Sequence, residues 1–378
     1  MVTWGASQRP FFIASLGADM SGTSRRNGRT TVVQAFKKRR VGRTNLEITE
    51  LGFGTATLPG QLGVTIPEAD ARGVVNAAYD AGIGYFDTAP MYGFGMSEHY
   101  VGDALRFRQD GRVLSTKVGR LMHPVPHESK RTGANPWSLP FPFSMTYDYS
   151  YDAVMRSFED SLQRLGLGRV DILLVHDIGV QTHGEEENKR LWAQLQDGGY
   201  RALSELKAQG VVSAIGIGVN EVPVLLDALE IGDWDAFLVA NRYTLLEQTP
   251  LETLLPACEK RGTSLIAAGP FAGGILAGTD IWGPPTGAYN RTPPAIMERV
   301  RAIDTVCKAH NVPLGAAAIQ FALAHPVVCT VLTGPKSPKE LDGILGWWNA
   351  PIPAAFWDEL ADRKLVAAGT PLPNGRTA

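Results

Sequence analysis

Eight short apolar segments that alternate with helix-like segments constrain the fold of this chain more than any other feature. From about residue 40 onward each segment has the composition of a β-strand, and helical periodicity follows it before the next one begins. Several of these segments are apolar without alternation, which suits parallel strands buried on both faces. The eight segments are 46–56, 84–89, 112–117, 169–176, 212–219, 235–240, 263–269 and 328–334.

This repetition favours a closed (β/α)8 barrel with long loops over its C-terminal face, since eight β/α units fit into about 300 residues. The alternative is a doubly wound open sheet, which needs the pattern G-x-G-x-x-G after its first strand. That pattern is missing there. Gly216 and Gly218 come too late, and Glu221 stands where the third glycine belongs. We therefore predict one barrel domain over residues 39–378, preceded by a disordered extension over residues 1–38.

The composition limits the cellular compartments and the classes of binding partner to be expected for this protein. A secretion signal or a transit peptide is the alternative for the Ser-, Arg- and Gly-rich N-terminus, but neither has a convincing cleavage context. No apolar stretch approaches the ~18 residues of a membrane span. A formal net charge of -2 gives no basic field that would favour nucleic acid or a membrane surface. Because the three cysteines form no CxxC pair, we expect buried, reduced thiols and a cytoplasmic protein.

Three segments are longer than ordinary barrel loops. They are residues 118–149, residues 270–293 and the tail after about residue 345. The first carries Trp137, Phe141 and Phe143, and long aromatic loops above the C-terminal rim of a barrel commonly wall a substrate pocket. For any single aromatic residue, the alternative is that it only anchors its loop to the barrel.

Four polar residues lie at the C-terminal ends of predicted strands or just beyond them: Asp87, Tyr92, Lys117 and His176. Such ends share one rim, where a parallel barrel gathers its catalytic groups. A free tyrosine, with a pKa near 10, is a poor base at neutral pH, but a nearby ammonium stabilises its phenolate. We assign Tyr92 as acid/base, Lys117 as the group that lowers its pKa, Asp87 as the partner of the lysine, and His176 as the residue that orients the substrate oxygen. The set predicts an enzyme.

Each of these residues has a simpler interpretation when it is taken alone. Tyr92 could be a packing aromatic and His176 a core histidine, whereas a lysine at a buried strand end is seldom free. His123 and His127 have the i, i+4 spacing of a metal pair. They lie in a Pro-rich segment without a third ligand nearby, so we predict no metal site.

The motifs FDTAPMYG, STKVGR, MRSFEDSLQRLGLGRVDILLVH and GIGVN resemble the aldo-keto reductase superfamily, and the resemblance runs from about residue 39 to the end. The segments SYDAVMRSFEDSLQRLG, LVHDIG and GGYRALSELKAQGVVSAIGIGVNE are most similar to the D-threo-aldose 1-dehydrogenases, which oxidise L-fucose, L-galactose and D-arabinose. The related pyridoxal 4-dehydrogenase belongs beside them. The resemblance implies the same barrel and an oxidoreductase that uses NAD or NADP.

The resemblance also implies a nicotinamide site at the barrel mouth. Asn220 and Asn241 stand where the family binds the carboxamide, and an asparagine can both donate and accept hydrogen bonds. A turn residue is the alternative for Asn220. Gly54 and Thr55, after the first strand, are expected to let the backbone approach the nicotinamide.

The sequence departs from the family after the seventh strand. Many relatives have Tyr-Ser-Pro there, with the tyrosine stacked on the nicotinamide, whereas this chain has Ala-Gly-Pro ending at Pro270. We expect Phe271 to provide the stacking surface instead.

The adenosine end of the cofactor is expected at TGPKSPKELD. Gly334 to Ser337 precede a predicted helix start at Pro338, and backbone N–H groups there suit a phosphate. Relatives that prefer NADP have a basic residue where this chain has Glu340, and a carboxylate repels a 2′-phosphate. The ammonium of Lys336 would instead attract a 2′-phosphate and so favour NADP. We predict NAD as the cofactor, with NADP as the alternative.

These features together predict oxidation of the anomeric hydroxyl of an aldose to a lactone by hydride transfer to nicotinamide. One alternative is a pyridoxal 4-dehydrogenase that forms 4-pyridoxolactone; another is a general NADPH aldehyde reductase, which Glu340 disfavours. The expected partner is a sugar or a pyridoxal-like small molecule, not nucleic acid or a membrane, and a homodimer is compatible with the sequence. A non-catalytic barrel is disfavoured because all four rim residues are present.

Overall fold

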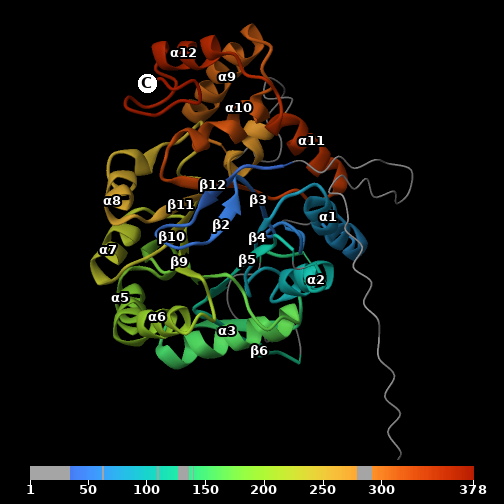
Figure 1. Cartoon of the computed structure of the whole chain (residues 1–378), viewed down its shortest axis with the longest axis vertical. Helices are drawn as coiled ribbons and strands as arrows, with labels where there is room; N and C mark the ends of the chain where they lie inside the picture. Colours follow the sequence, from blue (N-terminus) through green and yellow to red (C-terminus); the bar gives the residue numbers. More distant parts are fainter. Residues whose placement is uncertain (1–34, 62–63, 109, 127–135, 139, 279–291) are drawn as a thin grey trace, which may run out of the picture.

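Eight parallel strands close into a barrel in the order β3-β4-β5-β8-β9-β10-β11-β12, and β12 pairs back with β3. The structure is a computed structural model that describes residues 35–378, apart from 62–63, 109, 127–135, 139 and 279–291. The predicted (β/α)8 barrel is confirmed (Figure 1). The barrel strands are β3 (Leu51–Gly54), β4 (Tyr85–Asp87), β5 (Val113–Val118), β8 (Ile172–His176), β9 (Ala214–Val219), β10 (Ala236–Ala240), β11 (Ser264–Ala268) and β12 (Val328–Thr333).

Helices surround the barrel on its outside (Figure 1). They are α1 (Glu68–Asp80), α2 (Met96–Leu105), α3 (Tyr151–Leu165), α4 (Val180–His183), α5 (Glu185–Gln194), η2 (Leu195–Gly199), α6 (Tyr200–Ala208), α7 (Pro223–Ile231), η3 (Thr249–Leu251), α8 (Leu254–Arg261), η4 (Ala272–Ala277), α9 (Pro294–Ala309), α10 (Leu314–Phe321), η6 (Ala322–Ala324), α11 (Pro338–Trp348) and α12 (Ala354–Asp362). Between α9 and α10 the chain turns at Asn311, which has a positive φ of 55°, and Pro313 precedes the new helix.

Two antiparallel hairpins lie outside the barrel. The first predicted strand, 46–56, is in fact two strands, because β2 (Glu47–Thr49) pairs with β1 (Lys38–Arg40) and only β3 enters the barrel. The second hairpin, β6 (Arg120–Pro124) with β7 (Phe143–Tyr147), is built from the long segment after β5. Residues 1–34 of the predicted extension lie outside the described residues. Phe36 packs against Trp348 with ring centroids 5.8 Å apart, so the packed chain begins before residue 39.

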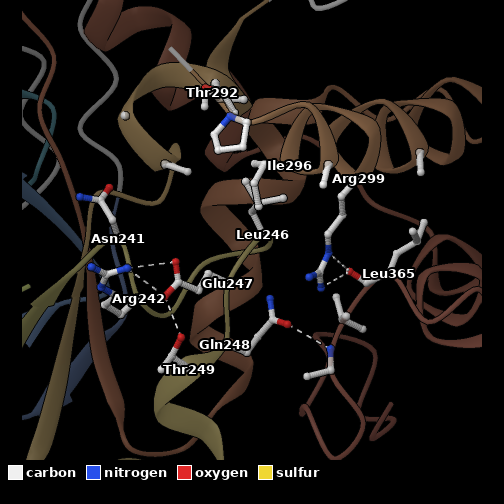
Figure 2. A pocket seen from close by; sticks show the side chains of 18 of the residues that line it. Asn241, Arg242, Leu246, Glu247, Gln248, Thr249, Thr292, Ile296, Arg299 and Leu365 are labelled. Atoms are coloured by element: carbon white, nitrogen blue, oxygen red, sulfur yellow. Dashed lines mark hydrogen bonds and ion pairs between the residues drawn. The ribbon is translucent and has the colours of Figure 1, made fainter. Parts of the chain in front are cut away.

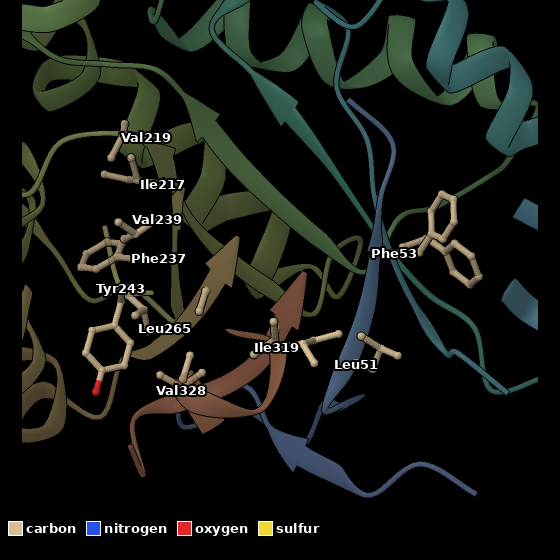
Figure 3. Close-up of a cluster of buried hydrophobic side chains, with 14 of the residues drawn as sticks. Leu51, Phe53, Ile217, Val219, Phe237, Val239, Tyr243, Leu265, Ile319 and Val328 are labelled. Atoms are coloured by element: carbon tan, nitrogen blue, oxygen red, sulfur yellow. The ribbon is translucent and has the colours of Figure 1, made fainter. Parts of the chain in front are cut away.

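Both faces of the barrel strands are buried, which explains their continuous apolar sequences. Ile217 and Val219 of β9, with Phe237 and Val239 of β10, belong to the large core between strands and helices, where Ile319 of α10 also lies (Figure 3). The alternate residues of the strands fill the lumen in a second core. Its members include Ile172, Leu174, Leu238, Ile266 and Leu332. This two-sided burial is the arrangement expected of a parallel sheet covered by helices.

The strand register places the C-terminal ends of neighbouring strands level with one another. Asp87 pairs with Gly54 on one side and with Ser115 on the other, and His176 pairs with Gly218. Close packing of the strands explains part of the Gly-Ile-Gly sequence in β9. A Cβ atom at Gly216 would lie 1.9 Å from the backbone carbonyl oxygen of Ala236, so only glycine fits there.

The three cysteines are free and buried, as expected. Burial raises the pKa of each of the thiols of Cys258, Cys307 and Cys329 to about 12, which leaves them protonated and unreactive. Within the described parts of the chain, no helix is long and apolar enough to cross a bilayer.

Candidate active site

Lys117 and Asp87 form an ion pair that is almost completely buried at the C-terminal rim of the barrel. The Nζ atom of Lys117 donates to Oδ2 of Asp87 at 2.6 Å and to the carbonyl oxygen of Thr88 at 2.8 Å. The hydroxyl of Ser115 donates to the other carboxylate oxygen of Asp87 at 2.6 Å. Burial alone would lower the pKa of Lys117, but Asp87 and Tyr92 outweigh it and the pKa is raised. The lysine is therefore a fixed, permanent cation.

Tyr92 lies beside this cation in the loop between β4 and α2. The Nζ atom of Lys117 is 4.9 Å from the centre of the Tyr92 ring. Burial raises the pKa of the phenol and Lys117 lowers it, with a net increase above the ordinary value. The expected lowering by Lys117 is therefore present but does not prevail, because burial disfavours the phenolate more strongly. In the free protein Tyr92 holds its proton.

His176 completes the group at the end of β8. Its ring lies edge-on to Tyr92, with centroids 5.7 Å apart and an interplanar angle of 88°. Burial, Arg120 and Lys117 together hold the pKa of His176 well below its usual range, so the imidazole is neutral near pH 7. Within the described residues, its Nδ1 atom has no hydrogen-bond partner. A neutral imidazole can donate one hydrogen bond to a substrate oxygen without carrying a charge.

A cleft of about 720 Å³ runs from this group toward the start of α11, and Asp87 and Tyr92 lie at its inner end. Its volume is typical of a cofactor or substrate site. Eight of the ten residues predicted to bind the cofactor line it: Gly54, Thr55, Asn241, Pro270, Phe271, Gly334, Lys336 and Glu340. A nicotinamide dinucleotide fits this donor set, because amide, hydroxyl and backbone groups occur along its length. Their roles in binding remain predictions.

The far end of the cleft is formed by the first turn of α11. The helix starts at Pro338, as predicted, and the hydroxyl of Ser337 accepts a hydrogen bond from the backbone N–H of Glu340 at 3.2 Å. Oε2 of Glu340 accepts from the backbone N–H of Lys336 at 2.9 Å, and Oε1 lies 3.7 Å from Nζ of that lysine. The carboxylate thus partly neutralises the cation that would attract a 2′-phosphate.

Phe271 and Trp347 form an aromatic wall along the cleft. Their ring centroids are 5.5 Å apart at an interplanar angle of 64°, and both residues line the cavity. Trp347 was not among the predicted site residues. It belongs to the long C-terminal segment after about residue 345, and its contact with Phe271 depends on how α11 packs beside the β11–η4 turn.

Asn220 does not line the cleft but a second cavity, which it shares with Asn241. This larger cavity, of about 1720 Å³, adjoins the cleft at Asn241 and is bordered by α9 and the C-terminal segment (Figure 2). In this cavity Arg242 pairs with Glu247 at 3.2 Å, and Arg299 donates to the carbonyl of Leu365. The backbone carbonyl of Asn220 accepts from Arg242 at 2.7 Å, an arrangement that fits the turn-residue alternative.

The aromatic residues of the long first loop do gather beside Tyr92. Trp137 is buried and meets the ring of Tyr92 edge-on at 5.9 Å. Phe141 and Phe143 pack against the same small cluster. Its buried members are Phe94, Met122, Trp137 and Met145. The cluster can form one apolar side of a substrate pocket, and this role stays a prediction. In the same loop, His123 bonds the hydroxyl of Thr146 at 2.9 Å, and His127 lies outside the described residues.

A parallel barrel that places an ion pair, a tyrosine and a histidine beside a long cleft has the form of an enzyme. The sequence model of the aldo/keto reductase family matches residues 50–363, and the chain belongs to that family. It is an oxidoreductase of a family that generally uses nicotinamide cofactors.

Individual relatives are similar over almost their whole length. The chain is 42% identical over 349 residues to pyridoxal 4-dehydrogenase from Microbacterium luteolum, which covers 89% of this chain and 99% of that protein. It is 37% identical over 325 residues to D-threo-aldose 1-dehydrogenase from a Pseudomonas species, with 85% and 95% covered. A solved aldo-keto reductase from Bacillus halodurans, in its holo form, has a TM-score of 0.69 at 25% identity and covers 90% of this chain and 100% of that one.

The neutral state of His176 predicts a pH dependence of stability. Because its folded pKa lies below the unfolded value of about 6.5, the unfolded chain takes up this proton first as the pH falls. Stability should therefore decrease below pH 6.5, by at most about 1.4 kcal/mol per pH unit from this one group. Replacing His176→Gln should make the loss of unfolding free energy between pH 7.5 and 5.5 smaller than in the wild type. An equal loss in both proteins would show that His176 is not held neutral by burial.

Proposed function

We propose that the protein is an NAD-dependent dehydrogenase that oxidises the anomeric hydroxyl of an aldose of the L-fucose, L-galactose or D-arabinose type to a lactone. The observation that carries this proposal is the position of the Lys117 ammonium, which contacts Asp87 and faces the ring of Tyr92 at the inner end of the cleft. Alcohol oxidation needs a base beside the hydroxyl, and this arrangement provides one. The 37% identity to a D-threo-aldose 1-dehydrogenase supports the substrate class.

In the proposed reaction Tyr92 first releases its own proton to solvent, and the phenolate then takes the proton of the anomeric hydroxyl. Lys117 stabilises this phenolate before the transfer, and Asp87 keeps the lysine charged and in place. His176, neutral because it is buried, orients the reacting oxygen by a hydrogen bond. A nicotinamide bound in the cleft supplies the hydride acceptor. Trp137 covers Tyr92 on one side and helps to exclude water.

A second candidate is the oxidation of pyridoxal to 4-pyridoxolactone, which is also a hemiacetal-to-lactone step. The aromatic cluster beside Tyr92 favours it, since an indole next to the acid/base can stack on a pyridine ring. The 42% identity to a pyridoxal 4-dehydrogenase is further support. Assays of the purified enzyme with L-fucose, L-galactose, D-arabinose and pyridoxal, followed by the absorbance of reduced nicotinamide, distinguish the two. Turnover of none of the four would contradict both.

NAD is proposed as the cofactor because Glu340 shields the start of α11. Its carboxylate binds the backbone N–H of Lys336 and lies near the side-chain ammonium, so a 2′-phosphate would meet a negative charge where it needs donors. The ribose hydroxyls of NAD can instead donate to this carboxylate. The same feature disfavours a general NADPH aldehyde reductase.

Replacing Tyr92→Phe should lower kcat by roughly 10²- to 10⁴-fold, because the acid/base is removed while the ring stays. Cofactor binding, measured by quenching of tryptophan fluorescence, should change little. The matched control is Tyr243→Phe, since that buried phenol has no hydrogen-bond partner among the described residues and lines neither cavity. The control should retain activity. A Tyr92→Phe enzyme as active as the control would refute the assigned role.

Replacing Glu340→Arg should shift the ratio of the dissociation constants of NAD and NADP toward NADP by about tenfold or more, because a repulsive charge becomes a donor. Fluorescence titration with both oxidised cofactors measures this ratio. The control is Glu230→Arg, which makes the same charge change at an exposed site on α7, paired with Arg261. If both variants shift the ratio equally, or neither does, Glu340 does not set the preference.

A further inference from the structure

A second buried ion pair lies beside His176 and has no part in the mechanism above. Arg120, the first residue of β6, donates from Nη2 to Oδ2 of Asp177, the residue that follows β8. The two partners are not equally buried: the side chain of Arg120 is 2% exposed and that of Asp177 is 21% exposed. The carboxylate of Asp177 is thus the member of the pair that remains partly accessible to solvent.

Arg120 is fixed from several sides. Its guanidinium lies over the ring of Tyr147 at 5.1 Å, and Nη1 contacts the sulfur of Met91, the residue before Tyr92. A buried arginine loses much of its hydration, and an apolar residue of similar size would often be as stable in such a place. The buried position of Arg120 is better explained by the carboxylate that it binds. Among the described residues, the only carboxylate that it binds is Asp177.

Asp177 faces the reacting group. Its Oδ2 atom is 3.5 Å from Nε2 of His176, and its negative charge also reaches Tyr92, where it opposes the phenolate. The backbone has a left-handed φ of 49°, and the N–H donates to the carbonyl of Gly218 at 2.9 Å. Oδ1 accepts no hydrogen bond from the described residues. One carboxylate oxygen is therefore fixed by Arg120, and the other has no hydrogen-bond donor among the described residues.

We propose that Asp177, held by Arg120, accepts a hydrogen bond from a substrate hydroxyl on the carbon next to the reacting carbon, and so selects hydroxylated substrates. The inference rests on the proposed function, in which His176 orients the reacting oxygen. Oxygens on neighbouring carbons lie about 3 Å apart, close to one hydrogen-bond length, so they can face the imidazole and the carboxylate together. In an aldose this second group is the hydroxyl on C2.

A site built to bind a hydroxyl discriminates strongly against a substrate that lacks it. The deoxy substrate leaves a desolvated carboxylate without a donor, which is a larger loss than a missing apolar contact. The aromatic cluster around Tyr92 cannot make this distinction, since it contacts carbon atoms of either substrate. Discrimination at this position should therefore depend on Asp177.

The test compares the NAD-dependent oxidation of D-arabinose and 2-deoxy-D-ribose, two aldoses that differ by the hydroxyl on C2. The wild type should favour D-arabinose by about 100-fold in kcat/KM, and Asp177→Leu should reduce this ratio to within a few-fold of one. The ratio is informative even where overall activity falls. If Asp177→Leu unfolds because Arg120 is left unpaired, the double variant R120M/D177L removes both charges and should show the same loss of preference.

Three results would overturn the inference. One is a wild-type ratio near one, and another is a ratio that stays at the wild-type value in Asp177→Leu or in the double variant, which would make Asp177 a purely structural partner of Arg120. The third is a wild type that oxidises no aldose, which would refute the proposed function and the inference together. The first two results leave the proposed function intact, so the two failures can be distinguished.

Discussion

The ion pair between Lys117 and Asp87 is the interaction on which the rest of the site depends. Each charge loses on the order of several kcal/mol of hydration at the mouth of the barrel, and only close contact and further hydrogen bonds can offset that loss. The hydroxyl of Ser115 and the carbonyl of Thr88 supply those bonds. Removal of either partner would leave a buried, unpaired charge and cost about 3–5 kcal/mol.

Burial and this fixed cation together determine the protonation of the neighbouring groups. Burial disfavours the charged form of any residue, so it raises the pKa of Tyr92 and lowers that of His176. Lys117 opposes the first shift and reinforces the second. The lysine is thus the group that brings the phenol toward a usable base while it keeps the imidazole neutral. Acid/base chemistry at Tyr92 depends on this balance between desolvation and charge.

The fold and the rim residues could be predicted from sequence because both follow from local patterns. Apolar segments at regular spacing predict a parallel barrel, and residues at the C-terminal ends of its strands must share one rim. Contacts that depend on loop paths could not be predicted. Asn241 lines the cofactor cleft, whereas Asn220 lies in the neighbouring cavity. Arg120 and Asp177 are 57 residues apart and meet because each lies two residues beyond a paired residue of the neighbouring strands β5 and β8, a register that no single segment of the sequence shows. The net pKa of Tyr92 depends on burial, which no motif reports.

The most direct test of this account is the pKa of the Tyr92 phenol, measured by NMR of ¹³C-labelled tyrosine in the wild type and in Lys117→Met, with Tyr92→Phe used to assign the signal. If the ammonium is the group that stabilises the phenolate, its removal must raise the pKa of Tyr92 further above the wild-type value. This measurement needs no substrate, and a loss of turnover in the variant does not affect it. An unchanged or lower pKa in Lys117→Met would contradict the central role of the lysine.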